Sequence, residues 1–263
     1  MSKLKFDFPV SERTYKVIED RKLKLFIFEP EVKQTDRPAI LFFNGGSFKK
    51  NTKSPVQFQH QANYFASKGM VAICVDYRNG SDKDFLPTQA ITDVKSAIRW
   101  VRRNSSELGV DPNKIVVCGS SAGGYVTISS IMFKDFNDEP EYSNQSIDHI
   151  PNLLIIFAAG MDGVDIMRRR YPQLLENATK LSPIHNMKKC LPRTLWICGT
   201  ADDFYAQNLD FITQMRDKGN DITFKTFEGM EHGFFNYGKH QNKYFHKTRM
   251  EMEKYLHSFN VIS

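Results

Sequence analysis

The chain has 263 residues, of which 41% are hydrophobic and 25% are charged. This is the composition of a globular protein with enough apolar residues for a sizeable core, and the length suits one α/β domain. No apolar run approaches the ~20 residues that a membrane-spanning helix needs, so no membrane span is expected. The N-terminus lacks the apolar segment of a secretory signal, which predicts a cytoplasmic location.

The net charge of +6 would suit an acidic partner such as nucleic acid. The basic residues are spread along the chain without a nucleic-acid-binding motif, so we expect no such partner and interpret the charge as a solvated surface. The four cysteines show no metal-like spacing, and reduced thiols are predicted. Three of them lie in expected strands, namely Cys74, Cys118 and Cys198, and Cys190 lies in a loop.

The expected strands have alternating hydrophobicity near the N-terminus and are continuously apolar further along the chain. Residues 13–19 and 22–28 alternate and are separated only by Asp20-Arg21, which predicts an antiparallel hairpin. Later runs are continuously apolar, as in strands buried on both faces of a parallel sheet. These runs lie at residues 39–43, 71–75, 115–117, 153–157 and 194–198, and a more alternating run at 222–227 suits a sheet edge.

The connecting segments have the apolar spacing of amphipathic helices. The residues that share a helix face are Phe58, Ala62 and Phe65; Ile91, Val94, Ile98 and Val101; Leu209, Ile212 and Met215; and Phe245, Thr248, Met252, Tyr255 and Phe259. A hairpin followed by strand–helix units predicts an α/β fold with a mostly parallel, doubly wound sheet. We expect one domain over residues 1–263, with a small cap-like insertion at about 161–186 that holds a short helix around Asp165 to Leu175.

Gly119-Ser120-Ser121-Ala122-Gly123 stands between an expected strand and an expected helix. A strand, a sharp turn with serine at its apex and a helix together form a nucleophile elbow, in which the flanking glycines let strand and helix pass closely. The motif makes Ser121 the candidate nucleophile. A glycine-rich turn without chemistry remains the alternative at this point.

A nucleophilic serine needs a base, and the base needs an orienting carboxylate. His232 follows the expected strand at 222–227 in a tight loop, and Asp202 and Asp203 follow the strand at 194–198. The order Ser, Asp, His is the one that elbow chemistry uses. Only one of the two adjacent aspartates can point at the histidine. Asp202 is favoured as the acid, and Asp203 is the alternative.

The oxyanion of the transition state also needs donors. Elbow enzymes combine the backbone N–H after the nucleophile, here that of Ala122, with amides from the loop after an early strand. Asn44-Gly45-Gly46-Ser47-Phe48 follows the expected strand at 39–43, in the required place. Adjacent glycines allow the backbone to turn its N–H groups inward.

Six motifs together resemble those of an α/β-hydrolase esterase. They are Asn44-Gly45-Gly46, Asp76-Tyr77-Arg78, Gly119-Ser120-Ser121-Ala122-Gly123-Gly124, Leu181-Ser182-Pro183, Gly199-Thr200-Ala201-Asp202 and Glu228-Gly229-Met230-Glu231-His232-Gly233-Phe234-Phe235. The resemblance covers about residues 36–259 and is to the bacterial acetyl-esterase and feruloyl-esterase group, related to the hormone-sensitive-lipase type. It implies the α/β-hydrolase fold, with Ser121 as nucleophile, His232 as base and Asp202 as acid. It also implies an oxyanion hole from the N–H groups of Gly45, Gly46 and Ala122.

Two departures from the family pattern stand out. The family loop usually reads His-Gly-Gly-Gly-Trp, whereas this chain has Asn44-Gly45-Gly46-Ser47-Phe48, which puts the oxyanion geometry and the substrate choice in question. After Asp202, small residues, valine and proline are usual. Here Phe204 and Tyr205 follow, and they either line the pocket or pack in the core.

The predicted function is hydrolysis of carboxylic esters through an acyl-enzyme, on short-chain, chiefly acetyl, esters that include those of saccharides. No metal or organic cofactor is expected, the partner is a small-molecule or saccharide ester, and the sequence does not set the oligomeric state. A serine peptidase of the same fold and a non-catalytic binding protein on a hydrolase scaffold are the alternatives. Basic residues near the expected site suggest a rim that favours anionic substrates, with solvated surface charge as the alternative. They are Lys49, Lys50, Lys53, Arg168, Arg169 and Arg170.

Overall fold

The computed structural model describes residues 4–32, 34–50, 54–137 and 147–262. Within these residues eight strands form one sheet in the order β1-β2-β4-β3-β5-β6-β7-β8. The strands are β1 Ser11–Ile18, β2 Arg21–Phe28, β3 Arg37–Phe43, β4 Val71–Val75, β5 Val110–Ser120, β6 Leu153–Phe157, β7 Arg193–Gly199 and β8 Ile222–Phe227. The pairs β1–β2 and β2–β4 are antiparallel, and the others are parallel. The α/β-hydrolase fold with an N-terminal antiparallel hairpin is confirmed, and β8 forms the expected edge.

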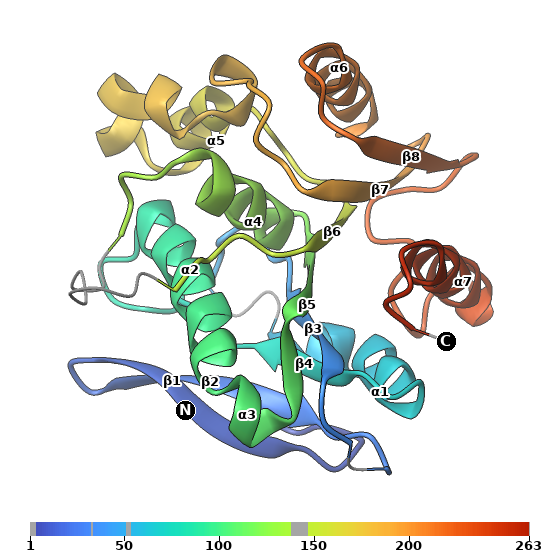
Figure 1. Cartoon of the computed structure of the whole chain (residues 1–263). Helices are drawn as coiled ribbons and strands as arrows, with labels where there is room; N and C mark the ends of the chain where they lie inside the picture. Colours follow the sequence, from blue (N-terminus) through green and yellow to red (C-terminus); the bar gives the residue numbers. More distant parts are fainter. Residues whose placement is uncertain (1–3, 33, 51–53, 138–146, 263) are drawn as a thin grey trace.

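Helices cover both faces of this sheet (Figure 1). They are α1 Gln59–Ser67, α2 Pro87–Arg103, α3 Ser105–Leu108, α4 Ala122–Met132, α5 Gly163–Arg170, α6 Tyr205–Asp217 and α7 Lys243–Ser258, with short 3-10 helices η1 Pro55–Phe58, η2 Pro172–Leu181, η3 Pro183–His185 and η4 His240–Asn242. Buried residues of α2, α4 and α6 share one apolar cluster with the sheet, and those of α1 and α7 share the other. Leu41 and Phe43 enter the first cluster, whereas Ile40 and Phe42 enter the second. The strands are continuously apolar because both of their faces are buried.

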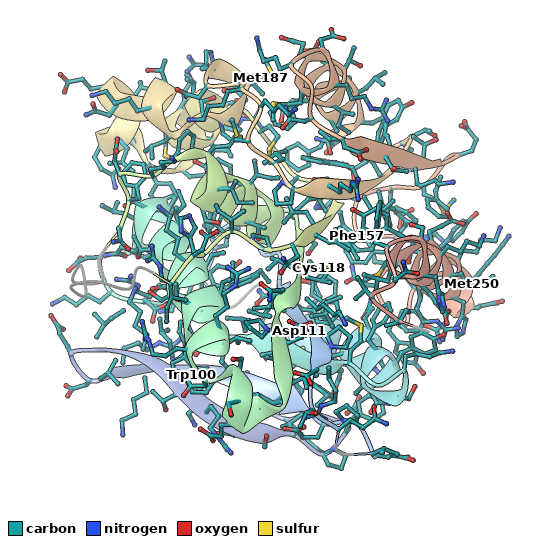
Figure 2. The ribbon with its side chains drawn as sticks, in the orientation of Figure 1. Trp100, Asp111, Cys118, Phe157, Met187 and Met250 are labelled. Carbon is teal, nitrogen blue, oxygen red and sulfur yellow. The ribbon has the colours of Figure 1, made fainter. Side chains whose placement is uncertain are left out.

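Side chains of the central strands β5 and β6 are buried and closely packed. Figure 2 labels Cys118 on β5 and Phe157 at the end of β6, whereas Met250 lies on the outer side of α7. Phe157 stacks on Phe235 with ring centroids 4.1 Å apart. Cys118 is a free thiol, like the other three cysteines, and burial raises its pKa. The sheet therefore gives the loops at its ends a rigid base.

One helix face differs from the sequence prediction. Leu209 was expected on the apolar face of α6, but it is 44% exposed, so that prediction is wrong. The buried position belongs to Asn208, whose side chain accepts a hydrogen bond from Trp196 Nε1 at 2.7 Å and donates one to the Ala159 carbonyl at 2.7 Å. A polar residue can take this place because both of its groups are paired.

A buried ion-pair network supports the end of β4. Arg78 donates from Nη2 to Asp93 Oδ1 at 2.7 Å, and the Asp93 side chain is fully buried. Tyr77, the preceding residue, donates its hydroxyl to the Asn44 carbonyl at 2.5 Å. Through Tyr77, the Asp76-Tyr77-Arg78 motif thus contacts the loop that follows β3.

Candidate active site

Ser121 lies at the turn between β5 and α4, with φ 51° and ψ −120°. This left-handed backbone is strained for any residue except glycine. A Cβ at Gly123 would lie 2.2 Å from the Phe43 carbonyl oxygen, and one at Gly119 would lie 2.7 Å from the Gly123 carbonyl oxygen. Both positions therefore require glycine, and the turn is held further by the Ser121 N–H, which donates to the Phe157 carbonyl at 2.9 Å.

Asp202 and His232, the predicted acid and base, lie side by side in the structure. Nδ1 of His232 lies 2.8 Å from Oδ2 of Asp202. The Asp202 side chain is completely buried, whereas that of His232 is 41% exposed. The other carboxylate oxygen of Asp202, Oδ1, accepts the Phe204 N–H at 2.9 Å, so both oxygens are held in place. Of the two neighbouring aspartates, Asp202 contacts the histidine and Asp203 is exposed.

Ser121 opens onto a pocket of about 100 Å³. The pocket is lined by Ser47, Phe48, Ser121, Ala122, Tyr125, Gly160, Asp165, Ile166, Arg169, Arg170 and Phe204. Phe204 also packs edge-on against the His232 ring, with the centroids 5.4 Å apart, and so connects the pocket wall to the histidine. Tyr205 instead stacks on Phe224 of β8, away from the pocket.

The loop after β3 lies directly against Ser121. A Cβ at Gly45 would come within 3.1 Å of Ser121 Cβ. Asn44, in place of the family histidine, donates from Nδ2 to the Gly45 carbonyl at 2.7 Å. Gly46 has φ 132° and Ser47 has φ 53°, so the backbone turns sharply here. The substituted asparagine therefore still holds this loop.

The predicted role of Gly45 needs a correction. Its N–H donates to Oε1 of Gln57 at 2.8 Å, so this donor is already paired and is not directed at a substrate oxygen. Ser47, two positions further along, lines the pocket together with Ser121 and Ala122. Sequence reasoning missed both Gln57 and Ser47. No local pattern marks Gln57, but the alignment of Ser47 with the third glycine of the family loop was an available signal.

Four aromatic residues pack together at the pocket, and two of them, Phe48 and Tyr125, line it. Phe48 is buried and lies within 6.4 Å, centroid to centroid, of Phe85, Tyr125 and Tyr171. Tyr125 donates its hydroxyl to the Leu181 carbonyl at 2.6 Å. Burial raises the pKa of Tyr171 to about 12. These rings remain neutral and fix the loop after β3, α4 and the end of α5 against one another.

The predicted basic residues separate into two groups. Arg169 and Arg170 line the pocket, whereas Lys49, Lys50 and Arg168 are not among the lining residues. Lys53 lies outside the residues that the structure describes. Among the described residues that line the pocket, those with positive charge lie at the end of α5.

The BD-FAE family model matches residues 25–156, half of the chain. The chain belongs to the BD-FAE family. Across the whole fold it is similar to esterase 2 of Thermogutta terrifontis: the structure phosphonylated by sarin is 33% identical, with a TM-score of 0.89, and 97% of this chain aligns with 96% of that one. The propionate-bound structure of the same esterase is 34% identical, with a TM-score of 0.86 and the same coverage. The resemblance to α/β-hydrolase esterases of the hormone-sensitive-lipase type is confirmed.

This BD-FAE member spans less than half of the length of two curated relatives that it matches. Carboxylesterase NlhH of Mycobacterium tuberculosis is 31% identical over 126 residues, which are 47% of this chain and 37% of the relative. The non-reducing polyketide synthase atr1 of Stereocaulon alpinum is 27% identical over 77% of this chain, which spans 8% of that protein. In the described part of the chain, every helix is too short or too polar to cross a membrane.

Proposed function

We propose that this chain is a serine hydrolase of carboxylic esters that acts through an acyl-enzyme. The observation that carries the proposal is the arrangement around Ser121. Its strained turn opens onto a pocket that Phe204 also lines, and the Phe204 ring packs on His232. His232 in turn is hydrogen-bonded to the buried Asp202. This is the set of groups that activates a serine hydroxyl. The similarity to esterase 2 and to carboxylesterase NlhH supports the same activity.

In the proposed acylation, Ser121 Oγ attacks the ester carbonyl carbon while Nε2 of His232 takes the hydroxyl proton. Asp202 accepts from Nδ1 and stabilises the imidazolium that forms. Collapse of the tetrahedral intermediate breaks the bond to the alcohol oxygen, which leaves with the proton from Nε2. Water then attacks the acyl-enzyme by the same steps in reverse order, releasing the acid and restoring Ser121.

The oxyanion is held by backbone N–H groups around the nucleophile. Ala122 supplies the donor at the start of α4, where the helix dipole also favours negative charge. From the loop after β3, we assign this role to Gly46 and Ser47, because the Gly45 N–H is bonded to Gln57. Ser47 lines the pocket beside Ser121, which supports its place in the set.

The acyl group of the substrate is proposed to be short, chiefly acetyl. The support is that the esterase 2 structures with propionate bound and with butyrate bound show short acids in a relative. Because each buried CH₂ adds ~0.8 kcal/mol of binding, a long apolar channel would make kcat/KM rise with chain length. A panel of acetyl, butyryl, octanoyl and feruloyl esters and acetylated sugars tests this, and an optimum at octanoyl would contradict it.

Two adjacent serines provide a matched test of the mechanism. Ser121→Ala should lose on the order of 10⁴ or more in kcat with acetyl esters, because the nucleophile is gone. Ser120→Ala is the control: its side chain is buried on β5, and its hydroxyl has no hydrogen-bond partner among the described residues. A fluorophosphonate probe should label the wild type and Ser120→Ala, but not Ser121→Ala.

The same experiment separates the alternatives. Labelling together with hydrolysis of peptides in preference to esters would indicate a peptidase. A folded wild type that neither hydrolyses esters nor reacts with the probe would indicate a binding protein on the hydrolase scaffold. Near-normal ester hydrolysis by folded Ser121→Ala would show that the nucleophile lies elsewhere.

A further inference from the structure

Arg170 places a positive charge on the pocket that contains the nucleophile. It is the last residue of α5, is exposed, and lines the pocket together with Ser121. Among the described residues, none forms an ion pair or a hydrogen bond with its guanidinium. A guanidinium has five N–H donors in a planar fork, which match the two oxygens of a carboxylate.

The neighbouring charges do not cancel this one. Nε of Arg169 lies 2.7 Å from Oδ1 of Asp165, one helical turn earlier, and both residues line the pocket. This internal pair contributes no net charge at the pocket. The guanidinium of Arg170 is left as the uncompensated cation among the residues that line it.

The end of α5 packs against the loop after β3, so the backbone at Arg170 is held in place. Tyr171, the next residue, packs its ring edge-on against Phe48, with the centroids 6.4 Å apart, and its hydroxyl lies 3.5 Å from the Phe48 carbonyl oxygen. At the other end of α5, Oδ1 of Asp162 caps the helix by accepting the N–H groups of Val164 and Asp165. The backbone that carries Arg170 is therefore anchored at both ends.

We propose that Arg170 is a specificity-determining residue that binds a carboxylate carried by the ester substrate, in addition to the ester group that Ser121 attacks. The preferred substrates are then monoanionic esters, with the carboxylate on either the acyl or the alcohol part. This inference rests on the proposed esterase function. The pairing of Asp165 with Arg169 aids the selectivity, because it keeps that carboxylate from neutralising Arg170.

Two pairs of esters, each matched in shape, test the proposal and locate the charge. Ethyl hydrogen succinate and ethyl succinamate differ only in an acyl-side carboxylate against a carboxamide. The pair 4-acetoxybenzoate and 4-acetoxybenzamide makes the same comparison on the alcohol side. For at least one pair, the wild type should favour the anion by about tenfold in kcat/KM, mainly through KM, which corresponds to about 1.4 kcal/mol. The preference should fall between 0.1 M and 1 M salt as the Debye length shortens from ~10 Å to ~3 Å.

Arg170→Gln should reduce this anion preference to about one, because it keeps a long polar side chain and removes the charge. Arg170→Lys should keep part of it, since an ammonium is a point charge without the planar fork. Arg168→Gln is the matched control: it removes an arginine of the same helix that does not line the pocket, and the preference should persist.

Failure of this inference differs from failure of the esterase proposal. Equal treatment of anion and amide by the wild type, or an anion preference that survives Arg170→Gln, would overturn the role of Arg170 while ester hydrolysis stands. If the wild type hydrolyses neither ester, binding of the same pairs to Ser121→Ala by calorimetry decides the matter. About tenfold tighter binding of the anion that is lost in Ser121→Ala/Arg170→Gln supports the site, and equal binding overturns it.

Discussion

The side chain of Gln57 accepts a hydrogen bond from the backbone N–H of Gly45 at 2.8 Å. Its Nε2 donates at the same distance to Oδ1 of Asn236, and Asn236 in turn donates from Nδ2 to the Gly233 carbonyl at 2.7 Å. Gly233 directly follows His232. One side chain thus connects the loop of the proposed oxyanion donors with the loop of the proposed base.

Gln57→Leu is expected to lower kcat by about tenfold with little change in KM, because both loops lose a shared contact and small displacements at reacting groups are costly. Gln57 acts here as a positioning residue, since it does not line the pocket. Gln57→Glu keeps an acceptor for the Gly45 N–H and should retain more activity. Steady-state kinetics with a 4-nitrophenyl ester, beside thermal unfolding of each variant, make the comparison. Unchanged kcat in a folded Gln57→Leu protein would contradict the positioning role.

Asp202→Asn should lower kcat on the order of 10³ to 10⁴, since an amide no longer stabilises the imidazolium. Asp203→Asn is the matched control on the adjacent residue, which is exposed, and it should stay within about twofold of the wild type. The ratio of the two kcat values is the measurement. A larger loss in Asp203→Asn would move the acid one position along the chain.

Much of this fold could be predicted because parallel strands carry a strong local signal. Residues buried on both sheet faces read as apolar runs, and five of those runs coincide with β3, β4, β5, β6 and β7. The positions of Gly119 and Gly123 were also predictable, since backbone atoms approach too closely for a side chain. Local backbone requirements of this kind can therefore be predicted from the residue types in the sequence.

Other features depend on contacts that no local pattern records. Gln57 and Asn236 are 179 residues apart, so their bond follows only from the assembled loops. Leu209 has the correct helical spacing but is exposed, because Asn208 finds partners for both of its polar groups. The Gly45 amide was assigned to the oxyanion from its motif alone, and only the tertiary contact with Gln57 shows where it points.

Gly123→Ala should reduce the free energy of unfolding by about 3 kcal/mol, because the added methyl would overlap a backbone carbonyl that cannot move aside. The Cβ would lie 2.2 Å from the Phe43 oxygen. Gly69→Ala is the control: it has φ +85° but nothing within 4 Å of the new Cβ, so it should cost only about 1 kcal/mol of backbone strain. Urea unfolding measures both variants. Equal losses would mean that the close approach at the elbow is not what requires glycine.

His149 is neutral in the fold. Its pKa is lowered to about 4, first by burial and then by the charges of Lys95 and Arg99. Nε2 lies 3.0 Å from the Ser130 carbonyl oxygen and Nδ1 lies 3.4 Å from Nη2 of Arg99, an arrangement that assigns the proton to Nε2. Protonation of Nδ1 would replace that contact with repulsion between two cations.

The sign of the pH effect follows from the two states. An unfolded histidine titrates near pH 6.5, so between about pH 6.5 and pH 4 the unfolded chain binds the extra proton and the fold does not. The contribution of His149 to stability is therefore complete above that window and falls as the pH decreases through it. His149→Gln removes the titration, so its free energy of unfolding, from urea titrations at about pH 7, 5.5 and 4.5, should decline less steeply than that of the wild type. Parallel declines in the two proteins would show that His149 is not a source of the acid sensitivity.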